Sequence, residues 1–104
     1  SELPLGHGHN YDLEVTVAGE PDPVTGMVID LKVLKEIVEE AVISRVDHKH
    51  LNFDVDFMQG IVPTAENIVI AFWEQLKDRF TGCELYELKL WETPRNKAVY
   101  RGGR

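Results

Sequence analysis

The residues best suited to chemistry stand near the start of the chain, in the stretch GHGHN, where His7 and His9 are separated by one glycine. They lead into an alternating segment that is typical of a β-strand. Residues i and i+2 of a strand point to the same face, so both imidazoles could bind one metal ion. Neutral imidazole is a common zinc ligand, and a catalytic zinc takes three protein ligands and keeps one position open. The pair is therefore either part of a zinc site or two partly buried histidines bonded to backbone.

A second candidate is the dipeptide Asp47-His48, at the start of a long segment without clear periodicity. A carboxylate beside a histidine can orient the ring and stabilise the imidazolium, as in a proton relay. In the alternative interpretation Asp47 ends or caps a turn and His48 is a surface residue. His50 is a competing imidazole, either a ligand or an exposed side chain.

Three further residues are weighed in the same way. Glu92 ends an apolar strand face, where it is either exposed or directed into a pocket that binds paired N–H donors. Thr64 is sufficiently explained as a helix N-cap, and substrate contact is an additional hypothesis. Cys83 is the only cysteine, so no internal disulfide can form, and with no adjacent base it is interpreted as structural.

The elements that must position these residues follow from periodicity and turn formers. The predicted order is strand, strand, helix, helix, strand, strand: Tyr11–Ala18, Met27–Ile29, a helix capped by Asp30 that ends near Ser44–Val46, a helix from Thr64 to about Arg79, Leu85–Glu92 and Lys97–Arg101. Tyr86, Leu88, Leu90 and Glu92 are expected to share one strand face. This order predicts a single α+β domain over residues 1–104, with a four-stranded antiparallel sheet and both helices on one face. The open sheet edges predict oligomerisation.

Composition narrows the class of protein. The chain has 104 residues, 43% of them hydrophobic, and a net charge of −7, which argues against a general nucleic-acid-binding surface. No apolar run is long enough to cross a bilayer, and no signal-like start is present. We therefore expect a cytoplasmic protein that acts on a small molecule, without nucleic-acid or membrane partners.

Five stretches occur in register with a known family: GHGHNYDLEVTV, DPVTGMVIDLKVLK, DHKHLN, PTAEN and LYELKLWET. Together they resemble the 6-pyruvoyl-tetrahydropterin synthase family, which includes the 6-carboxytetrahydropterin synthases of queuosine biosynthesis. The resemblance implies the tunnelling fold, or T-fold, in which an antiparallel sheet carries two helices on one face. It also implies a homohexamer built as a dimer of trimers.

The resemblance further implies roles for individual residues. His7 and His9 would be two of three zinc ligands, the third lying on a strand before Ser1. Asp47 and His48 would serve in proton relay, and Glu92 would anchor the pterin ring and take part in that relay. The implied substrate is 7,8-dihydroneopterin triphosphate, whose carbon–hydrogen bonds zinc would acidify while triphosphate leaves.

Two features of the start of the sequence depart from the family pattern. Ser1 stands where the family has its catalytic cysteine, and no strand precedes it in this sequence. Either an N-terminal part is omitted, which we favour, or the chain is a truncated and inactive variant. The hypotheses are therefore a lyase of the pyruvoyl type, its carboxy-forming counterpart, and an inactive pterin-binding module. A T-fold aldolase acting on dihydroneopterin is disfavoured because those proteins lack this zinc–histidine pattern.

Overall fold

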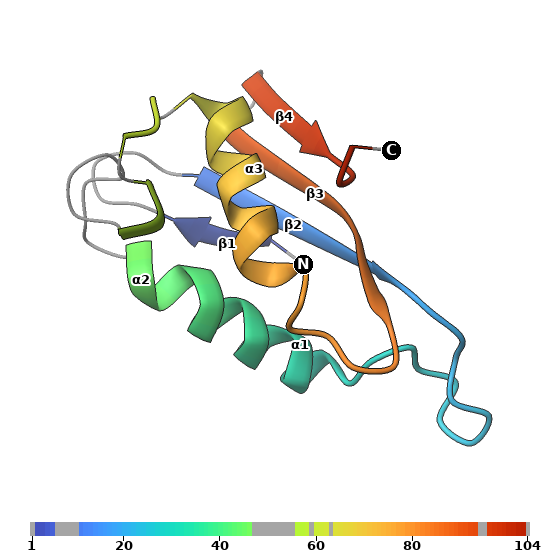
Figure 1. The fold of residues 1–104 in the computed structure, drawn as a ribbon. Coiled ribbons are helices and arrows are strands. Elements are labelled where there is room, and N and C mark those ends of the chain that lie inside the picture. The colour runs from blue at the N-terminus through green and yellow to red at the C-terminus, as the bar shows by residue number, and fades with distance from the viewer. Residues whose placement is uncertain are drawn as a thin grey trace.

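Four antiparallel strands form one sheet in the order β1-β2-β3-β4, and the helices lie against one face of it (Figure 1). The computed structural model describes residues 2–5, 11–46, 56–58, 60–62, 64–93 and 96–103. The strands are β1 (Glu2–Leu5), β2 (Tyr11–Ala18), β3 (Glu84–Thr93) and β4 (Asn96–Tyr100). The predicted α+β architecture is confirmed.

The β2–β3 pair forms the centre of the sheet and supplies much of its apolar face. Leu13 pairs with Leu90 and Val15 with Leu88, and these four side chains are buried under the helices. The register then shifts by one residue on β3, because Thr16 pairs with Glu87 but Val17 pairs with Leu85. Such a bulge changes which side chains of β3 point into the core beyond it.

The bulge makes one sequence-based prediction wrong. Tyr86 was expected on the face of Leu88 and Leu90, but it is 40% exposed, whereas Leu85 is only 2% exposed. Alternation alone cannot locate an extra residue within a strand, so the predicted face is confirmed for Leu88 and Leu90.

The predicted strand Met27–Ile29 is also wrong, since this run contains no strand. It follows a turn in which the Asp22 carboxylate accepts hydrogen bonds from the N–H groups of Val24 and Thr25, at 2.8 and 3.0 Å. Only three residues separate Gly26 from the helix N-cap Asp30, and Ile29 packs on the core instead of joining a ladder. The fourth strand of the sheet is β1, which pairs with residues 11–14 of β2.

The first helical region is continuous but changes its hydrogen-bonding pattern. It consists of α1 (Leu31–Val38), the π-helical segment η1 (Glu39–Ile43) and α2 (Ser44–Val46). The Asp30 side chain accepts from the Lys32 N–H at 2.8 Å, which confirms the predicted N-cap. The π segment has no signature in the sequence pattern, although the helix ends where it was predicted to end.

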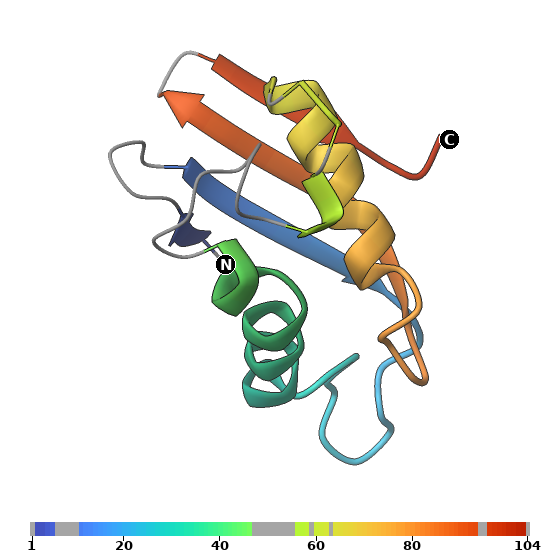
Figure 2. The ribbon, with the colours of Figure 1, turned by 60° about the vertical axis from the view of Figure 1, so that its left-hand side comes forward.

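The second long helix, α3 (Ala65–Leu76), crosses the sheet over β3 and β4 (Figures 1 and 2). Its apolar face forms the core with both central strands, and Phe72 is its largest fully buried side chain. A short 3₁₀ turn, η2 (Asp56–Met58), adds the buried Met58. Within the described part of the chain, no helix has the length and apolar character needed to span a membrane.

Candidate functional site

One end of the sheet carries Glu92, a candidate residue that the structure describes. The register pairs Leu5 with Tyr11, and Thr93 with Asn96, so β1 and β3 end where β2 and β4 begin. Figures 1 and 2 place α2 and the start of α3 at this same end. We call it the loop end of the sheet, defined by Leu5, Tyr11, Glu92 and Asn96.

Four of the predicted site residues lie outside the described residues: His7, His9, Asp47 and His48. The same holds for Ser1 and His50. Segment 6–10 connects the end of β1 to the start of β2, and segment 47–55 follows α2. The described residues to which both segments are joined therefore belong to the loop end. Among the described residues no cluster of three metal-binding side chains is found, and all four histidines of the sequence fall outside them.

Glu92 is described, and it occupies an irregular position in β3. Trp91 pairs with Lys97 and Thr93 with Asn96, so two steps on β3 match one step on β4. Glu92 is the extra residue of this bulge. Its half-buried carboxylate accepts a hydrogen bond at Oε2 from Nδ2 of Asn96, at 2.8 Å. Bulges re-aim side chains at the ends of sheets, and here the re-aimed side chain is the predicted pterin ligand.

Thr64 is found at the helix start for which it was predicted. Its Oγ1 accepts from the Asn67 N–H at 3.2 Å, and its own N–H donates to the Val62 carbonyl at 2.8 Å. Asn67 Nδ2 donates to the same carbonyl at 2.9 Å. The hydrogen bond from Asn67 confirms the N-cap role of Thr64. The Thr64 side chain is exposed, and its contact with substrate stays a prediction.

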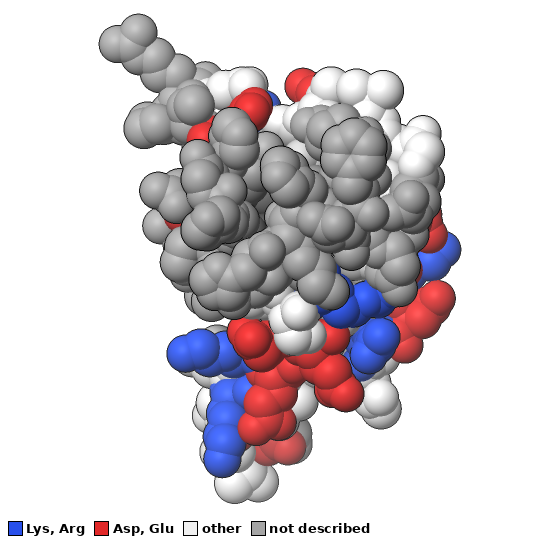
Figure 3. Space-filling view, turned by 90° about the vertical axis from the view of Figure 1, so that its left-hand side faces the viewer, with Lys and Arg blue, Asp and Glu red and all other residues white. Residues whose placement is uncertain are grey.

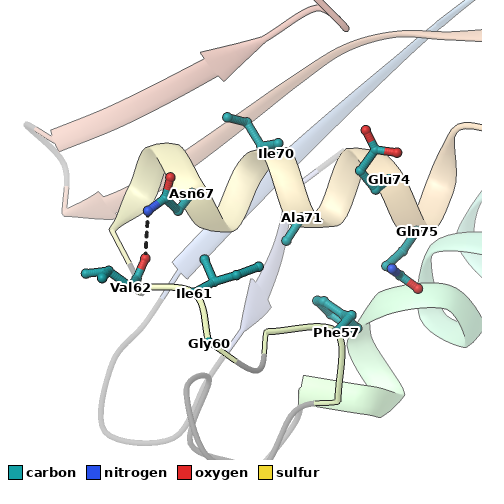
Figure 4. Close-up of a pocket in the computed structure, with 9 residues that line it drawn as sticks. All are labelled: Phe57, Gly60, Ile61, Val62, Asn67, Ile70, Ala71, Glu74 and Gln75. Atoms are coloured by element: carbon teal, nitrogen blue, oxygen red, sulfur yellow. Dashed lines mark hydrogen bonds between the residues drawn. The ribbon is translucent and has the colours of Figure 1, made fainter.

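A groove on the outer side of α3 was missed by sequence reasoning (Figure 4). It has a volume of about 510 Å³ between α3 and residues 57 and 60–62, and its apolar lining includes Phe57, Ile61 and Ala71. At one end Arg45 donates to Oε1 of Gln75 at 2.7 Å and lies over the Phe57 ring at 4.8 Å. These contacts join residues far apart in sequence, so no local pattern could have indicated them.

An ion pair on the uncovered face of the sheet was missed as well. Glu87 is only 8% exposed, and its carboxylate accepts from Nε of Arg101 at 2.6 Å, with Nζ of Lys89 at 3.7 Å. The hydrogen bond from Arg101 lowers the pKa of Glu87 below its ordinary value, despite the opposing effect of desolvation. This cluster lies on the side of β3 opposite the core.

The described residues on the face that Figure 3 shows include charged side chains of both signs. Asp and Glu side chains gather in the lower part of that view, with Lys and Arg beside them. Helix α1 and η1 contribute the exposed Glu36, Glu39 and Glu40 on their side of the molecule. The mixture of signs indicates a solvated helix face, and we assign it no binding role.

Comparison with known proteins matches this architecture to one family. The family model described as "6-pyruvoyl tetrahydropterin synthase" matches residues 2–103. The chain belongs to the 6-pyruvoyl tetrahydropterin synthase family. A synthase structure of this family from Caenorhabditis elegans superposes with a TM-score of 0.83 at 40% identity, covering 93% of this chain and 69% of that one.

Relatives of the family extend the comparison. The human 6-pyruvoyl tetrahydrobiopterin synthase is 46% identical over 99 residues, which are 95% of this chain and 68% of the human protein. A different activity is named for a Pyrococcus furiosus relative, "Dihydroneopterin monophosphate aldolase", which is 38% identical over 83% of this chain and 69% of its own length. At the level of the family, the predicted fold and the prediction of a lyase of tetrahydrobiopterin biosynthesis are confirmed.

Proposed function

We propose that the protein is a zinc-dependent lyase that converts 7,8-dihydroneopterin triphosphate to 6-pyruvoyl-tetrahydropterin with release of triphosphate. The observation that carries the proposal is the bulged Glu92 carboxylate at the loop end of the sheet, within a chain 46% identical to a named synthase. The segments that contain His7, His9, Asp47 and His48 join described residues of that same end.

Glu92 is suited to binding the pterin ring. The 2-amino group and the neighbouring ring N–H of a pterin form two parallel donors, which a carboxylate binds in a bidentate manner. Partial burial of Glu92 strengthens these hydrogen bonds, because fewer water molecules compete with the ring for the carboxylate oxygens. We therefore assign ring recognition to Glu92, and we keep Thr64 at the start of α3 as a second substrate contact.

The donor set of His7 and His9 fits zinc, since two neutral imidazoles at i and i+2 are first-choice nitrogen ligands. When bound, zinc would acidify the C–H and O–H bonds in the side arm of the substrate. Asp47 and His48 would then move protons between positions of that arm, with the carboxylate orienting the imidazole.

The two sheet edges, β1 and β4, have no further strand beside them among the described residues. Exposed strand edges are usually paired or covered. We propose that copies of the protein associate through these edges, in a hexamer made of two trimers. We also propose a cytoplasmic location, on the basis of amino-acid composition.

The zinc content of the purified protein tests the metal site. We expect about one zinc per protomer, lost in His9→Ala, because a pair of ligands is reduced to one. Met27→Ala, at an exposed residue outside the loop end, is the control and should keep its zinc. Zinc retained at full occupancy in His9→Ala would contradict the assignment.

A second candidate, dihydroneopterin phosphate aldolase, is favoured by the Pyrococcus furiosus relative. A retro-aldol reaction breaks a carbon–carbon bond of the substrate's side arm and leaves the phosphate on the departing fragment, whereas the lyase expels inorganic triphosphate. The carboxy-forming reaction would release acetaldehyde in addition to triphosphate, and an inactive pterin-binding module would release nothing. Product analysis therefore separates all four hypotheses.

A further inference from the structure

We propose that Asn96 is a positioning residue that fixes the orientation of the Glu92 carboxylate for binding the paired N–H donors of a pterin ring. This inference rests on the proposed function, because it takes Glu92 as the ring ligand. Asn96 touches the carboxylate and not the ring.

The first argument is the backbone at Glu92. Because Glu92 is the extra residue between the pairs Trp91–Lys97 and Thr93–Asn96, it has no partner on β4 to define its orientation. A bulged residue is left out of the ladder, so its side chain needs another restraint. The amide of Asn96, the first residue of β4, supplies that restraint.

The second argument is the division of the carboxylate's hydrogen-bonding capacity. A carboxylate has about four acceptor sites on its two oxygens. Asn96 Nδ2 uses one site on Oε2, at 2.8 Å, and Oε1 has no hydrogen-bond partner among the residues that the structure describes. Both oxygens therefore keep a site for a bidentate donor pair while the carboxylate plane is held.

The third argument is that this hydrogen bond joins two side chains. Asp22, Asp30 and Thr64 all accept hydrogen bonds from nearby backbone N–H groups, and so stabilise turns and helix starts. Asn96 instead donates across the β3–β4 turn to another side chain, in a turn already closed by the Thr93–Asn96 backbone pair. Its amide thus orients Glu92.

The test is a double-mutant cycle read by titration of the purified protein with neopterin, whose ring fluorescence reports binding. The variants are Asn96→Ala, Glu92→Ala and the double variant, with Lys97→Ala as the control on the next residue of β4. We expect Asn96→Ala to raise the Kd for neopterin about 3- to 10-fold, which is less than the loss of a direct hydrogen bond to a charged group, because Asn96 acts on the ring only through Glu92. Lys97→Ala should bind like the wild type.

Positioning further predicts that Asn96→Ala causes no additional loss once Glu92 is alanine. Asn96→Asp, which keeps the shape but removes the donor, should weaken binding at least as much as Asn96→Ala. With 7,8-dihydroneopterin triphosphate, KM should rise by a larger factor than kcat falls. The thermal midpoint of each variant is measured beside the wild type, to show that the variants are folded.

Two results would overturn the inference alone: wild-type Kd in Asn96→Ala while Glu92→Ala binds weakly, or an equal loss from Asn96→Ala in both backgrounds. If Glu92→Ala binds neopterin as tightly as the wild type, the ring ligand itself is wrong. In that case the proposed function loses its support and the inference falls with it.

Discussion

Single polar side chains at the loop end of the sheet are positioned by short-range hydrogen bonds. Asn96 reaches Glu92 across a turn, and Thr64 accepts from the Asn67 N–H at the start of α3. Both bonds form between residues fewer than five positions apart. The type and spacing of Thr64 predicted its N-cap role, whereas the bulge that re-aims Glu92 depends on β4 and was not predictable.

The N-cap gives a prediction for stability. We expect Thr64→Ala to lower the free energy of unfolding by about 1 kcal/mol, because the Asn67 N–H loses its acceptor at the helix start. Thr64→Ser keeps a hydroxyl and is the matched control. Urea denaturation measures both variants, and equal loss in the two would show that the hydroxyl is not what stabilises the helix.

The Glu87–Arg101 pair gives a prediction for pH. The pKa of Glu87 is lowered by its hydrogen bond from Arg101, so the folded state favours the ionised carboxylate more than the unfolded state does. The pair therefore stabilises the protein above the unfolded pKa of Glu87, and this contribution is lost as the pH falls through the lower folded value.

We expect Glu87→Gln to remove this acid-dependent contribution. The difference in unfolding midpoint between wild type and variant should be constant near neutral pH and should shrink as the pH is lowered below about 4.5. Thermal unfolding across that range provides the measurement. A difference that grows in acid would mean that the sign of the linkage is wrong.

At the scale of elements, the apolar pattern determines which faces of the helices and the sheet pack together. Bulges and the π-helical segment then change the direction of individual side chains. The alternation from Tyr11 to Ala18 predicted β2, and the spacing of apolar residues predicted α1 and α3. The bulges at Tyr86 and Glu92 and the π segment η1 were not predictable, because each arises from how one element fits its neighbours. The short run Met27–Ile29 was wrongly predicted to be a strand, because apolar residues alone do not make a segment pair with a sheet.

The packing of α3 on the sheet gives a prediction at this scale. Phe72 is 1% exposed and meets the Phe57 ring edge-on, with ring centroids 5.9 Å apart. We expect Phe72→Ala to lower the free energy of unfolding by about 3–5 kcal/mol, because it leaves a cavity between α3 and the strands. Ile70→Ala, at an exposed position of the same helix, should cost far less in the same denaturation series. Similar losses in both would contradict the assigned packing.

At the scale of the whole molecule, the topology brings together what the sequence separates. Glu92 is more than eighty positions from Leu5, yet β3 ends at the same end of the sheet at which β1 ends and β2 begins. Five motifs in register predicted the family, and the family match over residues 2–103 confirms it. The metal site and the proton relay stay predictions, since their residues lie outside the described ones.

The most direct test of the central claim is product analysis of a single reaction. Purified, zinc-loaded protein is incubated with 7,8-dihydroneopterin triphosphate, and the products are separated and identified by mass spectrometry. We predict 6-pyruvoyl-tetrahydropterin and inorganic triphosphate in equal amounts, with neither formed after the zinc is removed by a chelator. A phosphorylated two-carbon fragment, acetaldehyde, or unchanged substrate in the zinc-loaded reaction would contradict the proposed lyase.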